Sequence, residues 1–169
     1  MQTPGLSLAE KLDRSHTAVI VVDVQNAWCH PDGVRFVHQS PEVLASLKNK
    51  LRLLVDSARR GGLLLVFVRM AHDLVYLSPA YAEQLRIQGI YGEIVAGSWD
   101  AEYWEDIRPQ SGYREVEVTK HRYSAFNRTN LDLILSSNGI KTLVVSGVAT
   151  GGCVFATALE GFLNDYYTV

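Results

Sequence analysis

The stretch Thr17-Ala18-Val19-Ile20-Val21-Val22-Asp23 decides the fold class of this chain. Its apolar residues are continuous, mostly β-branched, and end on a carboxylate. A strand of continuous apolar residues is buried on both faces, which is typical of a parallel sheet covered by helices on both sides. The stretch therefore predicts a central strand of an α/β domain.

Further segments alternate between helix and strand along the chain. Ser40-Pro41-Glu42 is typical of a helix start and Gly61-Gly62 of a helix end. The other expected elements are a strand over 63–69, a short helix near 79–88, a strand over 115–120, a helix over 129–138, a strand over 142–148, a helix over roughly 152–163 and a strand that opens at 165. Alternation of this kind predicts a mostly parallel sheet.

Length and charge limit the class of protein. The chain has 169 residues, a net charge of −2 and 47% hydrophobic residues, which suits a single domain over 1–169 with residues 1–15 as an N-terminal arm. Without a positive field, nucleic acid is not an expected partner. No signal peptide and no apolar stretch of about 20 residues is evident, so we expect a cytoplasmic protein without a membrane partner.

Three reactive side chains lie at or just beyond the ends of predicted strands: Asp23, Lys120 and Cys153. The carboxyl ends of parallel strands form one rim of the sheet, where ligands bind. Cys153 follows Gly151-Gly152 in the first turn of a helix, whose N-terminus favours a thiolate and offers N–H donors to an oxyanion.

Each of the three residues also has an ordinary interpretation. Cys153 could be a buried structural cysteine, Asp23 a turn-forming aspartate and Lys120 a solvated lysine. A catalytic interpretation makes Cys153 the nucleophile, Asp23 its base and Lys120 the charge partner of both. Their coincidence at one rim favours catalysis over three unrelated structural roles.

A family resemblance rests on three segments, namely Val21-Val22-Asp23-Val24-Gln25-Asn26, Thr119-Lys120-His121-Arg122-Tyr123-Ser124-Ala125-Phe126 and Ser146-Gly147-Val148-Ala149-Thr150-Gly151-Gly152-Cys153-Val154. They resemble the isochorismatase-like cysteine hydrolases, which include nicotinamidases, N-carbamoylsarcosine amidohydrolases and ureidoacrylate or biuret hydrolases. The resemblance implies a three-layer α-β-α sandwich around a mostly parallel sheet.

The resemblance also implies the site. An Asp-Lys-Cys triad maps onto Asp23, Lys120 and Cys153, and a cis peptide is implied between Val148 and Ala149. The N–H groups of Ala149 and Cys153 would form the oxyanion hole. The implied reaction is hydrolysis of a small ureido, carbamoyl or carboxamide substrate through a thioester, without a cofactor.

Aromatic residues near the predicted rim are expected to wall the substrate pocket, with ordinary packing as the alternative for each: Trp28, Trp99, Tyr123 and Phe126. Family members are commonly homo-oligomers, so a dimer or tetramer is expected by analogy.

The chain departs from the family pattern in two places. Nicotinamidases bind a metal through an Asp-x-His pair and a further His after the second strand, whereas Arg69-Met70-Ala71-His72-Asp73-Leu74-Val75-Tyr76 offers one His beside one Asp. Catalytic metal sites use about three protein ligands, so we expect no metal and disfavour nicotinamide as substrate. Family members also continue past a motif like Asp165-Tyr166-Tyr167, so we expect this chain to lack the final strand and helix of the family.

Two other functions stay open at this point. The missing elements would suit a non-catalytic or degenerate assembly subunit of the same fold. An isochorismatase-type hydrolase would cleave a vinyl ether without relying on Cys153.

Overall fold

The computed structural model describes residues 6–36 and 40–169. Of the expected N-terminal arm, residues 1–5 lie outside the described residues, and the rest carries the single-turn helix α1 (Leu8–Lys11). Ser7 caps this helix, because its side chain accepts a hydrogen bond from the backbone N–H of Glu10 while the Glu10 side chain accepts one from the backbone N–H of Ser7.

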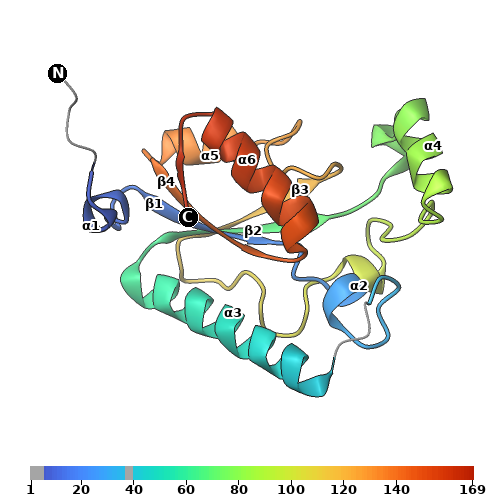
Figure 1. The fold of residues 1–169 in the computed structure, drawn as a ribbon, viewed down its shortest axis with the longest axis horizontal. Coiled ribbons are helices and arrows are strands. Elements are labelled where there is room, and N and C mark those ends of the chain that lie inside the picture. The colour runs from blue at the N-terminus through green and yellow to red at the C-terminus, as the bar shows by residue number, and fades with distance from the viewer. Residues whose placement is uncertain (1–5, 37–39) are drawn as a thin grey trace.

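A five-stranded parallel sheet forms the centre of the molecule, in the order β3-β2-β1-β4-β5 (Figure 1). The strands are β1 (Thr17–Val22), β2 (Leu64–Met70), β3 (Glu115–Lys120), β4 (Thr142–Gly147) and β5 (Tyr167–Thr168). The expectation of a parallel α/β sheet is confirmed, with each strand at or within about two residues of its predicted position.

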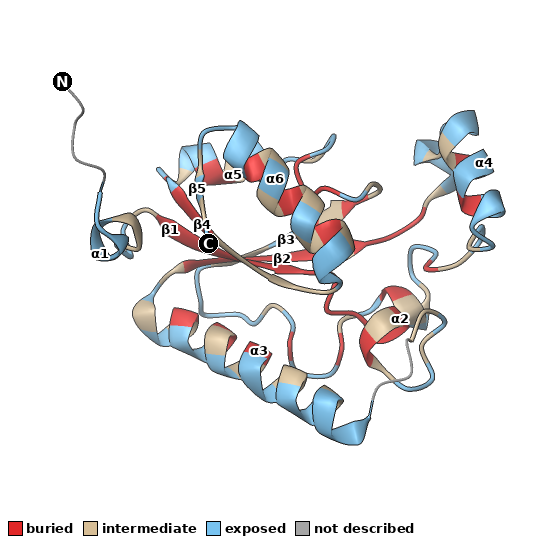
Figure 2. Ribbon diagram, in the orientation of Figure 1, coloured by how far each residue is buried: buried red, intermediate tan, exposed pale blue. Residues whose placement is uncertain are grey.

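Helices cover both faces of the sheet. Helix α3 (Pro41–Gly61) lies on one face, and α5 (Leu131–Ser137) and α6 (Phe155–Leu163) lie on the other (Figure 1). Alternate residues of β1 belong to two different core clusters: Val19 packs with Val55 of α3, and Ile20 with Leu135 of α5. Figure 2 shows the strands buried between these layers. The two-sided burial explains the continuous apolar sequence of β1.

The ends of α3 follow the predicted signals. Ser40 accepts a hydrogen bond from the backbone N–H of Val43, Pro41 occupies the first helical position, and Gly62 ends the helix with a left-handed φ of 69°. The helix buries Leu51, Val55 and Ala58, three positions on one helical face.

Shorter helices lie in the segments that follow the strand ends. They are α2 (Asn26–Cys29), α4 (Pro79–Ile87) and 3-10 helices over Leu74–Tyr76 and Trp99–Ala101. Helix α4, expected near 79–88, extends away from the sheet (Figure 1). Within the part of the chain that the structure describes, no helix is long and apolar enough to cross a membrane.

The helix expected over roughly 152–163 is divided into two parts. Thr150–Val154 forms a π-helical turn, and regular α-helix begins at Phe155. Gly152 has φ −125° and ψ −110°, far from helical values, so the chain kinks just before Cys153. The kink therefore separates Thr150 and Gly151 from Cys153 and the helix that follows it.

Candidate active site

Asp23 lies directly after β1 with an unusual backbone. Its φ is 53°, a left-handed value that aspartate tolerates better than most residues. The Asp23 N–H donates to the Val68 carbonyl at 2.8 Å, and the Gln25 N–H donates to the Asp23 carbonyl at 2.8 Å. These bonds hold the sharp turn at the strand end, and the side chain is buried with 1% of its surface exposed.

Gln25 connects this turn to the neighbouring strand. Its Nε2 donates to the Met70 carbonyl at 2.9 Å and to the Ala101 carbonyl at 2.8 Å, and its Oε1 accepts from the Met70 N–H at 2.8 Å. The side chain is fully buried. Sequence reasoning gave Gln25 no role, although a glutamine three residues beyond a buried strand was the available signal.

Lys120 reaches Asp23 across the end of an intervening strand. It is the last residue of β3, and β2 lies between β3 and β1. Its Nζ lies 2.8 Å from Oδ2 of Asp23 and 3.1 Å from Sγ of Cys153, and donates to the Arg122 carbonyl at 3.2 Å. The side chain is completely buried. One ammonium therefore contacts both the acid and the thiol.

The loop after β4 brings Cys153 to the same place. Gly147 ends β4 with φ 127°, and a Cβ there would lie 2.0 Å from the Val22 carbonyl oxygen, so only glycine fits. The peptide bond between Val148 and Ala149 is cis. The turn over Thr150–Val154 then places Cys153 against Asp23 and Lys120, at the point where strand order reverses between β1 and β4.

Burial dominates the electrostatics of the site. It raises the pKa of Asp23, and the charge of Lys120 and its hydrogen bond act in the opposite direction. Burial, followed by the Asp23 charge, raises the pKa of Cys153 to about 12. The expected stabilisation of a thiolate by a helix N-terminus is thus wrong for the resting site, because a thiol that is only 8% exposed loses its hydration and faces a carboxylate.

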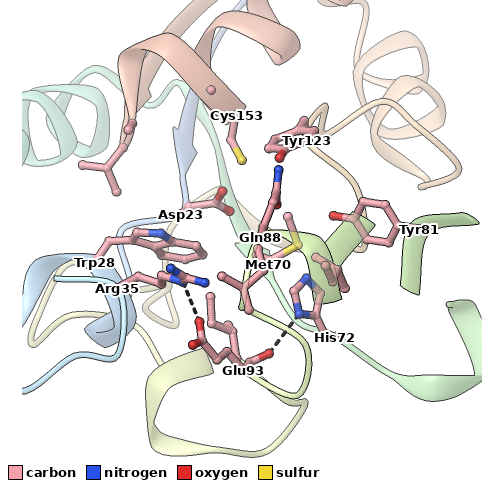
Figure 3. A pocket seen from close by; sticks show the side chains of 16 residues that line it. Asp23, Trp28, Arg35, Met70, His72, Tyr81, Gln88, Glu93, Tyr123 and Cys153 are labelled. Atoms are coloured by element: carbon pink, nitrogen blue, oxygen red, sulfur yellow. Dashed lines mark hydrogen bonds and ion pairs between the residues drawn. The ribbon is translucent and has the colours of Figure 1, made fainter. Parts of the chain in front are cut away.

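A cavity of about 340 Å³ opens beside Cys153 (Figure 3). Asp23, Ala149 and Gly152 line it with Cys153, so the backbone of the cysteine turn borders the space. Of the expected aromatic residues, Trp28 and Tyr123 line it. The rest of the wall is largely apolar and includes Met70, Leu85, Ile90, Ile94 and Val148.

Trp99 and Phe126 are not among the residues that line this cavity. Trp99 is 45% exposed and its ring packs at a right angle to that of His30, with centroids 4.9 Å apart. Phe126 is buried in the core and packs against Tyr166, with centroids 5.9 Å apart. The expectation of a pocket role for these two residues is therefore corrected to the packing alternative.

Five polar residues of the cavity were not foreseen: Arg35, His72, Tyr81, Gln88 and Glu93. They come from loops and helix ends, where no strand end or helical period marks a position as inward-facing. For Arg35 and Glu93, the signal available in the sequence was a charged residue in an aperiodic segment.

No metal-ligand set is found in the described part of the chain, since no three His, Cys, Asp or Glu side chains gather there. His72 and Asp73, the pair compared with the nicotinamidase ligands, have other partners. Nδ1 of His72 is hydrogen-bonded to the Glu93 carbonyl oxygen at 2.9 Å. Oδ1 of Asp73 accepts a hydrogen bond from the Val75 N–H at 2.9 Å. These side chains do not fit a metal site.

Comparison with known proteins gives consistent relatives. The ureidoacrylate amidohydrolase RutB of Caulobacter vibrioides is 30% identical over 92% of this chain and 75% of its own length. A cysteine hydrolase from Pseudomonas syringae has a TM-score of 0.81 at 26% identity, covering 99% of this chain and 75% of that one. N-carbamoylsarcosine amidase from Thermoplasma acidophilum has a TM-score of 0.73 at 31% identity, covering 90% and 79%.

The fold and the site thus define a protein of the isochorismatase-like cysteine hydrolase type. The isochorismatase domain model matches residues 17–169, and the chain belongs to that family.

Proposed function

We propose that this chain is a cysteine-dependent amidohydrolase that cleaves a small ureido, carbamoyl or carboxamide substrate through a thioester. The observation that carries the proposal is the buried Lys120 ammonium, 2.8 Å from Asp23 and 3.1 Å from Cys153, two residues that line a cavity. A buried charge of this kind is costly unless it serves a partner or a reaction. The names of the relatives, which include an amidohydrolase and an amidase, support the choice of an amide bond.

Acylation begins from a neutral thiol. Asp23 accepts the proton of Cys153 as Sγ forms a bond to the substrate carbonyl carbon, and Lys120 stabilises the negative charge during the transfer. Because the pKa of Cys153 is raised to about 12, proton removal has to coincide with attack. The raised pKa of Asp23 suits this role, since it makes the carboxylate a stronger base.

The carbonyl oxygen becomes an oxyanion during attack. We assign its stabilisation to the N–H groups of Ala149 and Cys153, because both residues border the cavity beside the thiol. Each such donor contributes about 3 kcal/mol to the transition state. Collapse of the intermediate breaks the C–N bond, and Asp23 returns the proton to the departing nitrogen.

Deacylation uses the same groups in reverse order. Asp23 takes a proton from a water molecule, whose oxygen attacks the thioester carbonyl. The oxyanion forms again in the same place, and the C–S bond breaks with return of the proton to Sγ. The enzyme is restored without any cofactor, and the products are an acid and ammonia or an amine.

The test compares the two cysteines of the chain. Cys153→Ala is expected to abolish ammonia release from a panel of ureido acids, biuret and simple carboxamides. Cys29→Ala is the matched control, because Cys29 is also buried but lies in the other core cluster, beneath α3. Ammonia release by Cys153→Ala at the rate of the natural chain would eliminate the nucleophile assignment.

We also propose that the chain assembles as a homo-oligomer, a dimer or a tetramer. Helix α6 exposes apolar side chains, with Phe155 60%, Phe162 64% and Leu163 69% exposed, and such a face is typical of a contact between subunits. Light scattering with size-exclusion chromatography tests this, and a monomer at micromolar concentration would contradict it.

A further inference from the structure

The end of the cavity away from the cysteine carries polar groups that the proposed mechanism does not use. Figure 3 shows Arg35, His72 and Glu93 together on the side opposite Cys153, with the Trp28 ring beside Arg35. Their surroundings are mainly apolar, so any polar group of a substrate that reaches this end depends on them for hydrogen bonds.

Arg35 has its charge compensated but keeps a donor. Its Nε pairs with Oε2 of Glu93 at 2.5 Å. Its Nη2 is buried and has no hydrogen-bond partner among residues 6–36 and 40–169. A buried guanidinium nitrogen of this kind retains N–H donors that a bound molecule can satisfy. The pair with Glu93 leaves this end of the cavity with no net charge.

His72 supplies the complementary group. Its Nδ1 lies 2.9 Å from the carbonyl oxygen of Glu93, and because a carbonyl only accepts, Nδ1 carries the proton. Burial lowers the pKa of His72, so the ring is neutral near pH 7 and its Nε2 holds a lone pair. Figure 3 shows this second nitrogen on the side of the ring that faces away from Glu93. Nε2 is therefore an acceptor.

We propose that this end of the cavity binds a second, uncharged amide or urea group of the substrate, with Arg35 donating to its carbonyl oxygen and His72 accepting from its N–H. The inference rests on the proposed function and narrows the substrate to diamides and ureides. A donor beside an acceptor matches an amide, which presents one of each.

A carboxylate fits the same groups poorly. Both of its oxygens are acceptors, so it has nothing to donate to Nε2 of His72. Its charge would also be buried next to Glu93, which already neutralises Arg35. The site therefore selects an uncharged end group over an anionic one of the same size.

Two pairs of isosteric substrates test the selection. Malonamide is compared with malonamate, and N-carbamoylglycinamide with N-carbamoylglycine; within each pair only the far group changes from amide to carboxylate. We expect kcat/KM to be at least about tenfold higher for the amide in the pair that fits, since a factor of ten corresponds to one lost hydrogen bond. A higher kcat/KM for the carboxylate in both pairs would overturn the proposal.

Binding is measured separately from turnover. Calorimetry on the Cys153→Ala variant gives Kd for the same four compounds, and the amide of the fitting pair is again expected to bind at least about tenfold more tightly. If no compound is hydrolysed by the natural chain, the proposed function fails, while the Kd ratio still decides the present inference. Equal or weaker binding of both amides would refute it.

Removing the compensating charge should weaken the selection of an amide over a carboxylate. In Glu93→Gln the Arg35 charge is unpaired, so the ratio of kcat/KM for amide over carboxylate is expected to fall at least about tenfold. Glu83→Gln, an exposed change on α4, is the matched control. An unchanged ratio in a folded Glu93→Gln variant would contradict the proposal. Should that variant not fold, Arg35→Met is used, with the ratio of malonamide over propionamide expected to fall because the donor is gone.

Discussion

Replacement of Lys120 by methionine tests the charge arrangement of the site most directly. The side chain keeps a similar length but loses the ammonium that lies 2.8 Å from Oδ2 of Asp23. Both side chains are at most 1% exposed, so Asp23 would be left as an unpaired buried carboxylate. Loss of one partner of a buried pair costs about 3–5 kcal/mol, a large share of the 5–15 kcal/mol typical of a domain.

The pH dependence of this loss has a definite sign. Burial already raises the pKa of Asp23, and Lys120 opposes that rise. In the variant the pKa is therefore higher still, so the native state holds the Asp23 proton more tightly than the unfolded chain. Stability then falls as the pH rises above about 4, the unfolded value, towards the native pKa. The deficit relative to the natural chain is expected to be larger at pH 7.5 than at pH 5.

Urea unfolding of the natural chain and the variant at both pH values measures the effect. Lys50→Met is the control, since Lys50 is exposed on α3. The double variant Asp23→Asn with Lys120→Met carries neither charge and is expected to regain at least about half of the loss while remaining inactive. A deficit below about 1 kcal/mol at pH 7.5, or a double variant less stable than Lys120→Met alone, would refute the account of a buried pair.

Three further outcomes follow from the site and the sheet. The rate of alkylation of Cys153, measured by mass spectrometry, is expected to rise about tenfold per pH unit from pH 7 to 10, because the pKa of the thiol is raised to about 12. A plateau in this rate near pH 8.5 would contradict the raised pKa. In urea unfolding, Gly147→Ala is expected to destabilise the fold by about 3 kcal/mol or more, because residue 147 has a φ of 127° and the added Cβ would clash with the main chain of β1. Gly151→Ala is the control. A Cβ at position 151 would have no atom within 4 Å, so stability should change by at most about 0.5 kcal/mol. Gln25→Leu removes three buried hydrogen bonds to backbone groups and is expected to lower the free energy of unfolding, measured in urea, by about 3–6 kcal/mol. Gln84→Leu is the control, because Gln84 is exposed on α4 and its replacement should leave that free energy unchanged.

The sequence predicts the frame of the molecule because its signals are local. Continuous apolar runs mark β1 and β2, and the sequence around Ser40 and Gly62 marks the two ends of α3. The meeting of Asp23, Lys120 and Cys153 was also predictable, because parallel strands place their carboxyl ends on one rim.

Other features depend on contacts between distant segments. The pKa of Cys153 depends on how deeply the turn is buried, which the helix-start pattern does not reveal. The far wall of the cavity pairs Arg35 with Glu93, residues from two aperiodic loops. Trp99 and Phe126 were misplaced because proximity to the rim in sequence does not say which way a side chain points.

The position of Lys120 on the last residue of an edge strand has a consequence for sheet pairing. Lys120 lies opposite Met70 in the β2–β3 ladder, and among the described residues β3 pairs with a strand on one side only. Side chains alternate between faces along a strand, so a slip of β3 by one residue would put Thr119 or the residue after Lys120 at the rim and turn the ammonium away. Hydrolytic rate would therefore report the alignment of this edge strand, because a chain that mispairs there would lose the contacts of Lys120 with Asp23 and Cys153.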